Sequence, residues 1–389
     1  MVPFRKYLML ILVLGFIFIF VGCEFNVINN TELDSNEICS GKHSLVASDS
    51  FYKCQNCDYR KETSKGFKYK ITDVEMRTCT ITDIGDCVDT NLYIPSTIEG
   101  FRVTSIGSCA FYYCHFLKEV TIPDCVLRIE EKAFLDCSQL ESITFAENGD
   151  LIEIGDHAFQ GCSTLQSVTI PNSVKSIGVY VFSHCRSLES ITVKPQNTVY
   201  YSEGNCLIHT NTKSVISGCK SSVIPKNVTS IGDAAFSGCL NLKYFTIPDN
   251  IERIGEDAFS GCDNLKKITL SNNLKSIGRA AFRGCINLIS VTIPNSVTTI
   301  EREAFYYCRE LKSIIVSNNI TNIEKYAFWE CDNLEQVYYL GDASNWSEIY
   351  IGEWGNWDMI NATRYFYFET QPTETGNYWH YVDGVPAAW

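Results

Sequence analysis

Four residues near the N-terminus have types and spacing that suit a metal ion or a disulfide. Cys39, His43, Cys54 and Cys57 form the pattern C-x3-H-x10-C-x2-C. Thiolate and imidazole ligands with a C-x2-C knuckle suit tetrahedral Zn²⁺. One or two disulfides fit the same cysteines, because an exported protein meets an oxidising environment. Either role is structural, since four protein ligands leave no open coordination position for catalysis.

Two further cysteines, Cys79 and Cys87, are eight residues apart. This spacing allows a disulfide that closes a hairpin at the N-terminal end of the main domain.

The first residues indicate export. Arg5 and Lys6 precede an uncharged apolar run at residues 7–21, which is shorter than the ~20 residues of a relaxed transmembrane helix. The run ends in Phe-Val-Gly-Cys23, which resembles a bacterial lipobox and implies that Cys23 is lipidated. Phe20 stands where leucine is usual in that pattern. We therefore predict a signal peptide at 1–22 and a lipidated tether at 23–37, with an uncleaved signal anchor or ordinary secretion as the alternatives.

The remaining cysteines belong to an internal repeat, which determines the fold. A phenylalanine recurs at intervals of 23, 25, 23, 54, 23, 23, 23 and 23 residues, with a cysteine three residues and a leucine six residues after each one. The phenylalanines are Phe111, Phe134, Phe159, Phe182, Phe236, Phe259, Phe282, Phe305 and Phe328. The cysteines occupy one phase of an apolar pattern, so we predict a ladder of buried, reduced thiols.

Each repeat reads I-G-x-x-A-F-x-x-C-x-x-L-x-x-V-T-I-P. The L-x-x-V-x-I part alternates apolar and polar residues as a half-buried strand does, and the I-G-x-x-A-F-x-x-C part has near-helical apolar spacing. We predict an α/β repeat solenoid of about ten coils at 67–340, with short strands on one wall and short helical turns on the other. A small Cys/His module at 38–66 precedes it and an aromatic-rich cap at 341–389 follows it.

The 54-residue interval predicts an aberrant coil at 186–235. Within it, two short apolar segments flank the turn-like Asn211-Thr212, which predicts a β-hairpin in place of the usual A-F wall. This coil is the best candidate for a distinctive feature on an otherwise regular surface.

The exposed side of the strands is a candidate ligand face, although threonine is also simply a good exposed strand residue. The predicted face comprises Thr121, Thr144, Thr169, Thr192, Tyr244, Thr246, Thr269 and Thr292.

The A-F-x-x-C-x-x-L-x-x-V-x-I-P pattern resembles the BspA-type leucine-rich repeat proteins over roughly residues 70–340. Residues 79–107 look like the degenerate first coil of such an array, and residues 377–384 look like an end segment seen with these repeats. The resemblance implies adhesion or protein binding at the cell surface and no catalytic residues.

Composition and motifs point the same way. The net charge of −13 argues against nucleic acid, and it leaves a lipid anchor as the only predicted contact with a membrane. No catalytic motif is present. We therefore predict a non-catalytic surface protein whose partners are extracellular or cell-surface proteins. The alternative is a glycan-binding module that uses the aromatic C-terminal segment, because aromatic rings stack on sugars.

Overall fold

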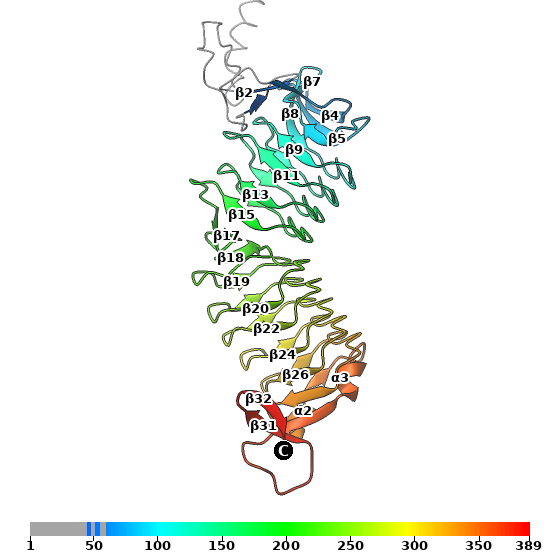
Figure 1. Cartoon of the computed structure of the whole chain (residues 1–389), viewed down its shortest axis with the longest axis vertical. Helices are drawn as coiled ribbons and strands as arrows, with labels where there is room; N and C mark the ends of the chain where they lie inside the picture. Colours follow the sequence, from blue (N-terminus) through cyan, green and yellow to red (C-terminus); the bar gives the residue numbers. More distant parts are fainter. Residues whose placement is uncertain (1–44, 48–50, 55–59) are drawn as a thin grey trace, which may run out of the picture.

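The computed structural model describes residues 45–47, 51–54 and 60–389 (Figure 1). The predicted signal peptide, the tether with Cys23, and Cys39, His43 and Cys57 lie outside the described residues. At the N-terminal end, β1 (Leu45–Ala47), β2 (Phe51–Cys54) and β3 (Arg60–Glu62) form an antiparallel sheet. Cys54 is the last residue of β2. No helix within the described residues is long and apolar enough to cross a membrane.

The main body is an elongated β-solenoid of about 13 turns of about 23 residues (Figure 1). Its length exceeds the ten or so coils predicted, because strands continue to stack beyond both ends of the recognisable repeat. Two ladders of short, mostly parallel strands run along it. Each ladder is interrupted at the aberrant coil, where the stack in Figure 1 is visibly offset.

The first ladder consists of the V-T-I strands of the repeat. Several of these strands end at a proline, because proline has no N–H to donate to the ladder. Its members before the aberrant coil are β6 (Asn91–Tyr93), β9 (Glu119–Ile122), β11 (Ser142–Phe145), β13 (Ser167–Ile170) and β15 (Ser190–Val193). After it come β20 (Tyr244–Thr246), β22 (Lys267–Thr269), β24 (Ser290–Thr292), β26 (Ser313–Val316), β28 (Gln336–Tyr339), β30 (Thr363–Tyr367), β31 (Tyr378–Val382) and β32 (Val385–Ala388).

The second ladder carries the shorter strands that precede each I-G step. It comprises β4 (Lys68–Asp73), β5 (Thr78–Asp83), β8 (Phe101–Ile106) with β7 (Thr97–Ile98) beside it, β10 (Arg128–Ile129), β12 (Glu153–Ile154) and β14 (Ser176–Ile177). Beyond the aberrant coil it resumes with β19 (Ser230–Ile231), β21 (Arg253–Ile254), β23 (Ser276–Ile277), β25 (Thr299–Ile300), β27 (Asn322–Ile323) and β29 (Tyr350–Ile351).

The wall opposite the first ladder, called here the turn wall, consists of tandem β-turns, so the predicted helical turns are wrong. In the first complete coil, Ala110 N–H donates to Gly107 O and Cys114 N–H donates to Phe111 O, which closes two successive four-residue turns. The other backbone donors bond to the next coil, as Phe111 N–H does to Ala133 O at 2.8 Å. A helix would need these donors for its own i→i−4 bonds.

Each coil of the turn wall has left-handed backbone at the residues two before and two after its phenylalanine. A turn with positive φ at its third position is of the kind that favours glycine or asparagine there. The residues are Cys109 and Tyr113, Lys132 and Asp136, His157 and Gly161, Tyr180 and His184, Ala234 and Gly238, Asp257 and Gly261, Ala280 and Gly284, Glu303 and Tyr307, and Tyr326 and Glu330.

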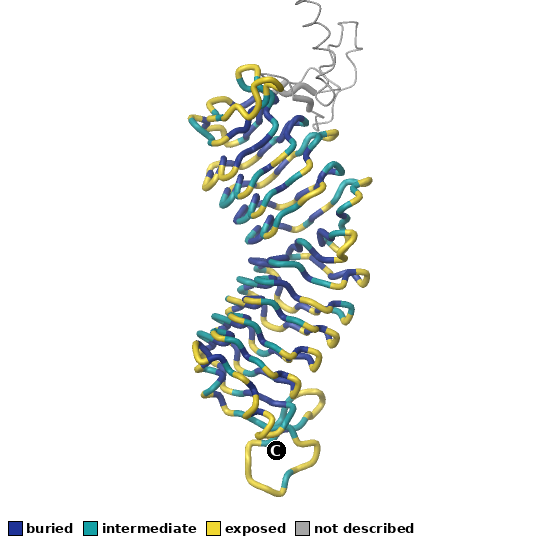
Figure 2. Tube along the Cα trace, turned by 180° about the vertical axis from the view of Figure 1, so that it is seen from behind, coloured by how far each residue is buried: buried dark blue, intermediate teal, exposed yellow. Residues whose placement is uncertain are grey.

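The phenylalanines form two buried stacks inside the solenoid. Neighbouring rings lie nearly parallel with centroids 4.9–5.9 Å apart, from Phe111 to Phe182 and again from Phe236 to Phe328. The buried side chains divide into two separate clusters at the same place. Figure 2 shows the buried residues as a continuous lining within each part of the stack.

The aberrant coil forms the partition between these two cores. β16 (Tyr200–Glu203), β17 (Cys206–His209) and β18 (Ser214–Ser217) make an antiparallel meander, which confirms the predicted hairpin. Side chains alternate across β17, because successive residues of a strand point to opposite faces. Leu207 packs in the N-terminal core, whereas Cys206 and Ile208 pack in the C-terminal core. We call this meander the septum.

At the C-terminal end, α2 (Ala343–Ser347), β29, α3 (Trp357–Asn361) and the last three strands of the first ladder close the stack (Figure 1). These two short helices are the only ones within the described residues, so the solenoid is a β-solenoid and not the α/β array predicted. The Asp342 carboxylate caps α2 by accepting from Asn345 N–H.

Candidate functional site

The cysteine sites predicted from the sequence have different outcomes. The structure describes neither Cys39, His43 and Cys57 nor the Cys54 side chain, so zinc or disulfide at this module stays a prediction. Among the residues that the structure describes, no group of three or more His, Cys, Asp or Glu side chains could hold a metal ion.

The disulfide predicted between Cys79 and Cys87 is not formed in the structure, where both thiols are free and buried. Cys79 lies in β5, and its thiol donates to Phe101 O at 3.6 Å. Cys87 lies outside the strands and lines a surface hollow of about 690 Å³ with Glu62, Asp86 and Asp89. The two thiols therefore lie in different environments, one in a strand and one at a surface hollow.

The repeat cysteines are free thiols with a regular structural role. Cys285 Sγ donates to Phe259 O, the carbonyl of the phenylalanine one coil earlier, at 3.3 Å. The same bond recurs from Cys137 to Cys331, at 3.0–3.4 Å, wherever two regular coils are adjacent. Burial raises the pKa of these thiols, for example to about 12 at Cys185. They are neutral packing groups.

The predicted ligand face forms one exposed surface in each part of the first ladder. Thr121 pairs in register with Thr144, Thr169 with Thr192, and Thr246 with Thr269. The hydroxyl oxygens of Thr169 and Thr192 are hydrogen-bonded at 2.9 Å. Tyr244 is 68% exposed at the start of β20. The structure thus brings these residues together in two groups, separated by the septum.

A second surface, which was not predicted from the sequence, lies on the turn wall of the C-terminal half. It consists of stacked arginine and aromatic side chains and is called here the turn-wall cluster. Its members are Arg283, Arg302, Arg309, Tyr306, Tyr307, Tyr326 and Trp329.

Guanidinium groups lie over the rings of this cluster. The guanidinium carbon of Arg309 is 4.5 Å from the ring centroid of Tyr307, and that of Arg283 is 5.1 Å from the ring of Tyr306. Arg302 lies 5.7 Å from the ring of Tyr326. Such cation–π contacts are attractive and hold both partners in place.

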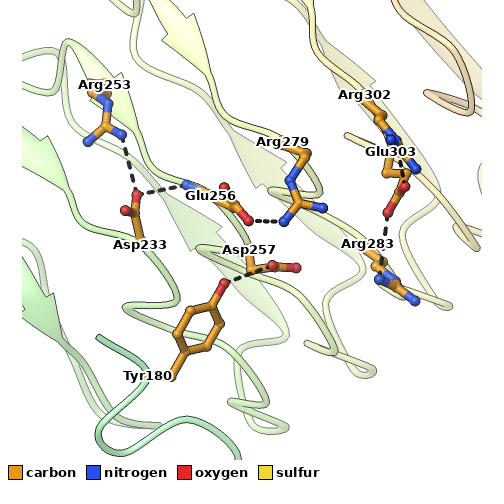
Figure 3. A network of polar contacts seen from close by, with 9 residues as sticks. All are labelled: Tyr180, Asp233, Arg253, Glu256, Asp257, Arg279, Arg283, Arg302 and Glu303. Carbon is orange, nitrogen blue, oxygen red and sulfur yellow. Dashed lines mark hydrogen bonds and ion pairs between the residues drawn. The ribbon is translucent and has the colours of Figure 1, made fainter. Parts of the chain in front are cut away.

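Carboxylates hold the arginines in place through ion pairs. Glu303, whose side chain is only 12% exposed, accepts from Arg302 Nε at 2.8 Å and lies 3.6 Å from Arg283 Nη1 (Figure 3). Arg309 is 3.7 Å from Glu330. The charges of the arginines are therefore partly balanced, while the arginines are exposed and the tyrosine and tryptophan rings are partly exposed.

The same wall carries polar contacts between coils nearer the septum. Figure 3 shows Asp233 accepting from Arg253 at 3.3 Å and from Glu256 N–H at 2.9 Å, and Glu256 paired with Arg279. In the same view, the Tyr180 hydroxyl, from a coil before the septum in the sequence, donates to Asp257, from a coil after it. Burial raises the pKa of both Tyr180 and Asp257.

The aromatic C-terminal segment divides into buried and exposed residues. Trp379 is fully buried and its indole N–H donates to Tyr339 O at 3.0 Å, while Trp346 packs edge-on against Tyr339. These side chains close the end of the core. A hollow of about 380 Å³ remains beside them, lined by Phe366, Phe368 and Tyr378 among others.

The stacked coils, the two parallel ladders and the internal rows of phenylalanine and cysteine define a β-solenoid of leucine-rich repeats. Comparison with family models agrees: the model described as BspA type leucine rich repeat region matches residues 104–228 and 215–335. The chain belongs to this family.

Solved structures resemble the chain in fold. The pneumococcal vaccine antigen PcpA is 20% identical, with a TM-score of 0.53, covering 83% of this chain and 95% of that one. A leucine rich cell surface protein of Faecalibacterium prausnitzii is 24% identical over 80% and 99% of the two chains, with a TM-score of 0.45. A leucine-rich repeat protein of Eubacterium ventriosum is 23% identical over 70% and 88%, with a TM-score of 0.48. No curated protein matches the sequence.

Proposed function

We propose that this chain is an exported, lipid-anchored and non-catalytic surface protein that binds other proteins through the turn-wall cluster. The observation that carries the proposal is the stacking of three arginines on tyrosine rings in a half-exposed surface. Arginine, tyrosine and tryptophan are the residue types that dominate binding energy at protein interfaces.

The contacts within the cluster favour binding in a second way. Long side chains normally lose conformational entropy when an interface forms. Here Glu303 and Glu330 already hold three arginines, and the rings of Tyr306, Tyr307 and Tyr326 already support them. Binding of a partner to the cluster therefore costs less side-chain conformational entropy.

The repeat body serves as a rigid support for this surface. Every coil of the turn wall is hydrogen-bonded to the next through its backbone, as Phe305 N–H is to Ala327 O at 2.8 Å. An extended body behind a lipid anchor would present the cluster away from the membrane, which agrees with the predicted tether.

The test is a binding screen with residues 24–389, made without the lipid, on an array of extracellular-matrix and cell-surface proteins. Saturable binding to a protein that is lost in Tyr306→Ala/Arg309→Ala supports the proposal. Binding that survives this double substitution, or no saturable binding to any protein on the array, contradicts it.

The alternative function, glycan binding, has one specific candidate site in the C-terminal segment. The hollow lined by Phe366, Phe368 and Tyr378 also has the polar groups Asp342, Ser344 and Asn377 on its wall. Rings combined with carboxylate and amide groups suit a sugar. Phe368→Ser should abolish binding to an array of neutral glycans if this alternative holds, and leave any such binding unchanged if it does not.

A further inference from the structure

The residues at the starts of the first-ladder strands differ in net charge on the two sides of the septum. Residues that directly precede the strands stack one per coil, as the hydrogen bonds Lys266 N–H to Lys243 O, Ile289 N–H to Lys266 O and Lys312 N–H to Ile289 O show, at 2.8–3.1 Å. In the C-terminal half this row runs through Lys243, Lys266, Ile289, Lys312 and Glu335, and Lys267 lies beside it as the first residue of β22.

The equivalent positions of the N-terminal half are Lys118, Glu141, Gln166 and Glu189, so only one of the four is a lysine. There the same backbone bonds join Glu141 to Lys118 and Glu189 to Gln166, and Glu119 begins β9. The contrast between the halves shows that the lysines are not a general property of the repeat.

The four lysines are exposed and unpaired. None of Lys243, Lys266, Lys267 and Lys312 forms an ion pair within the described residues. We call these four side chains the lysine row.

From this arrangement we infer that the lysine row binds an acidic polysaccharide, one that carries sulfate or carboxylate groups along its length. Ammonium groups on three of the four coils from Lys243 to Lys312 attract an anionic chain laid along the solenoid axis. Lysine is a flexible point charge and is depleted at protein interfaces, so the row differs in kind from the turn-wall cluster.

The neighbouring groups suit a sugar chain. The ring of Tyr244 is 68% exposed and lies 5.7 Å from the Lys243 ammonium. The exposed hydroxyls of Thr246, Thr269 and Thr292 follow the lysines from strand to strand. The surface thus offers a ring to stack on and hydroxyls to bond the sugar, beside the charges.

The spacing does not match an extended acidic peptide. Adjacent strands of a ladder are about 4.8 Å apart, whereas an extended peptide presents side chains on one side about every 6.8 Å. Carboxylates of such a peptide laid along the axis would fall out of step with the coils.

The experiment measures binding of residues 24–389 to heparin and to polygalacturonate, which separate sulfate from carboxylate recognition. The row variant is Lys243→Gln/Lys266→Gln/Lys267→Gln/Lys312→Gln. The control variant, Lys70→Gln/Lys118→Gln/Lys175→Gln/Lys325→Gln, removes the same charge from exposed lysines elsewhere. Melting temperatures within about 2 °C of the parent would show that both variants are folded.

We expect the parent to bind at least one of the two polymers, and the row variant to bind it roughly ten- to hundredfold more weakly. Binding of the control variant should match the parent, and binding of the parent should fall as salt is added. An equal loss in both variants, no loss in the row variant, or no binding by the parent overturns the inference. So does tighter binding to poly-glutamate or DNA of equal charge, because the occupant would then be another class of polymer.

The outcome is independent of the turn-wall cluster. The row variant should keep any protein partner found with the parent chain, and Tyr306→Ala/Arg309→Ala should keep polysaccharide binding.

Discussion

The hydroxyl group of Tyr180 donates a hydrogen bond of 3.0 Å to the carboxylate of Asp257, 77 residues further along the chain. The two residues occupy the same position, two before the phenylalanine, in coils on opposite sides of the septum. The bond links the turn walls of the two halves where the stack of phenylalanine rings is interrupted.

The Asp257 carboxylate should make stability depend on pH. Burial raises its pKa above the ordinary value of 3.8, so the folded state binds a proton more tightly than the unfolded state. The stability that this provides is present at low pH and is lost as the pH rises from 3.8 through the raised pKa. Asp257→Asn should therefore raise the melting temperature at pH 7 and reduce its decline above pH 4. A lower melting temperature at pH 7 would show instead that the bond from Tyr180 outweighs the cost of burial.

A substitution on one face of the septum should destabilise only the half of the solenoid that packs against that face. Leu207→Ala should loosen the N-terminal core and Ile208→Ala the C-terminal core, each by about 2–4 kcal/mol, because each residue is fully buried in only one cluster. Hydrogen exchange followed by mass spectrometry separates the two effects. Equal loss of protection in both halves from either substitution would mean that the septum does not divide the core.

The buried thiols should destabilise the protein at alkaline pH. Burial raises the pKa of Cys185 to about 12, so from pH 9 upward the folded state keeps protons that the unfolded state loses. Each such thiol then lowers the free energy of unfolding by about 1.4 kcal/mol per pH unit. Urea unfolding at pH 8, 9 and 10 should show a steep fall, which Cys185→Ala reduces by this amount. Cys109→Ala is the matched control, because Cys109 is exposed, and a similar reduction there would contradict the account.

Two glycines on the turn wall should respond differently to the same substitution. Both have positive φ, at +73° for Gly238 and +69° for Gly284. A Cβ on Gly238 would lie 2.5 Å from His184 Nδ1, whereas one on Gly284 would find its nearest neighbour at 3.7 Å. Gly284→Ala should thus cost only the strain of the left-handed backbone, about 1 kcal/mol. Gly238→Ala should cost clearly more in urea unfolding, and equal costs would place the His184 ring elsewhere.

Several features of the fold were predictable because they repeat. The spacing of Phe111, Phe134 and their successors predicts stacked coils, and the 54-residue interval predicts the hairpin of β17 and β18. The turn wall was misassigned for a physical reason. The A-F-x-x-C spacing fits a helix and a pair of β-turns equally well, and residues such as Asp136 and Tyr307 adopt positive φ without being glycine.

The turn-wall cluster was not visible as a pattern in the sequence. Arg283, Tyr306 and Trp329 occupy the same coil position in successive repeats, so they become neighbours only when the coils stack. A signal was available in the alignment of repeats, where that position changes from serine in the coils of Phe236 and Phe259 to arginine, tyrosine and tryptophan. The two faces of β17 were hidden similarly, since alternation alone does not tell a strand between two cores from a strand beside one.

The central claim, protein binding by the turn-wall cluster, is tested most directly by the affinity of two matched double variants for the partner found with the parent chain. Tyr306→Ala/Arg309→Ala removes one ring and one cation of the cluster. Tyr112→Ala/Arg186→Ala removes the residues at the same coil positions in the N-terminal half. We predict that the first variant weakens binding by about tenfold or more, as expected for interface residues of these types, and that the second leaves it unchanged. Equal affinities of the first variant and the parent, with both folded, would contradict the account.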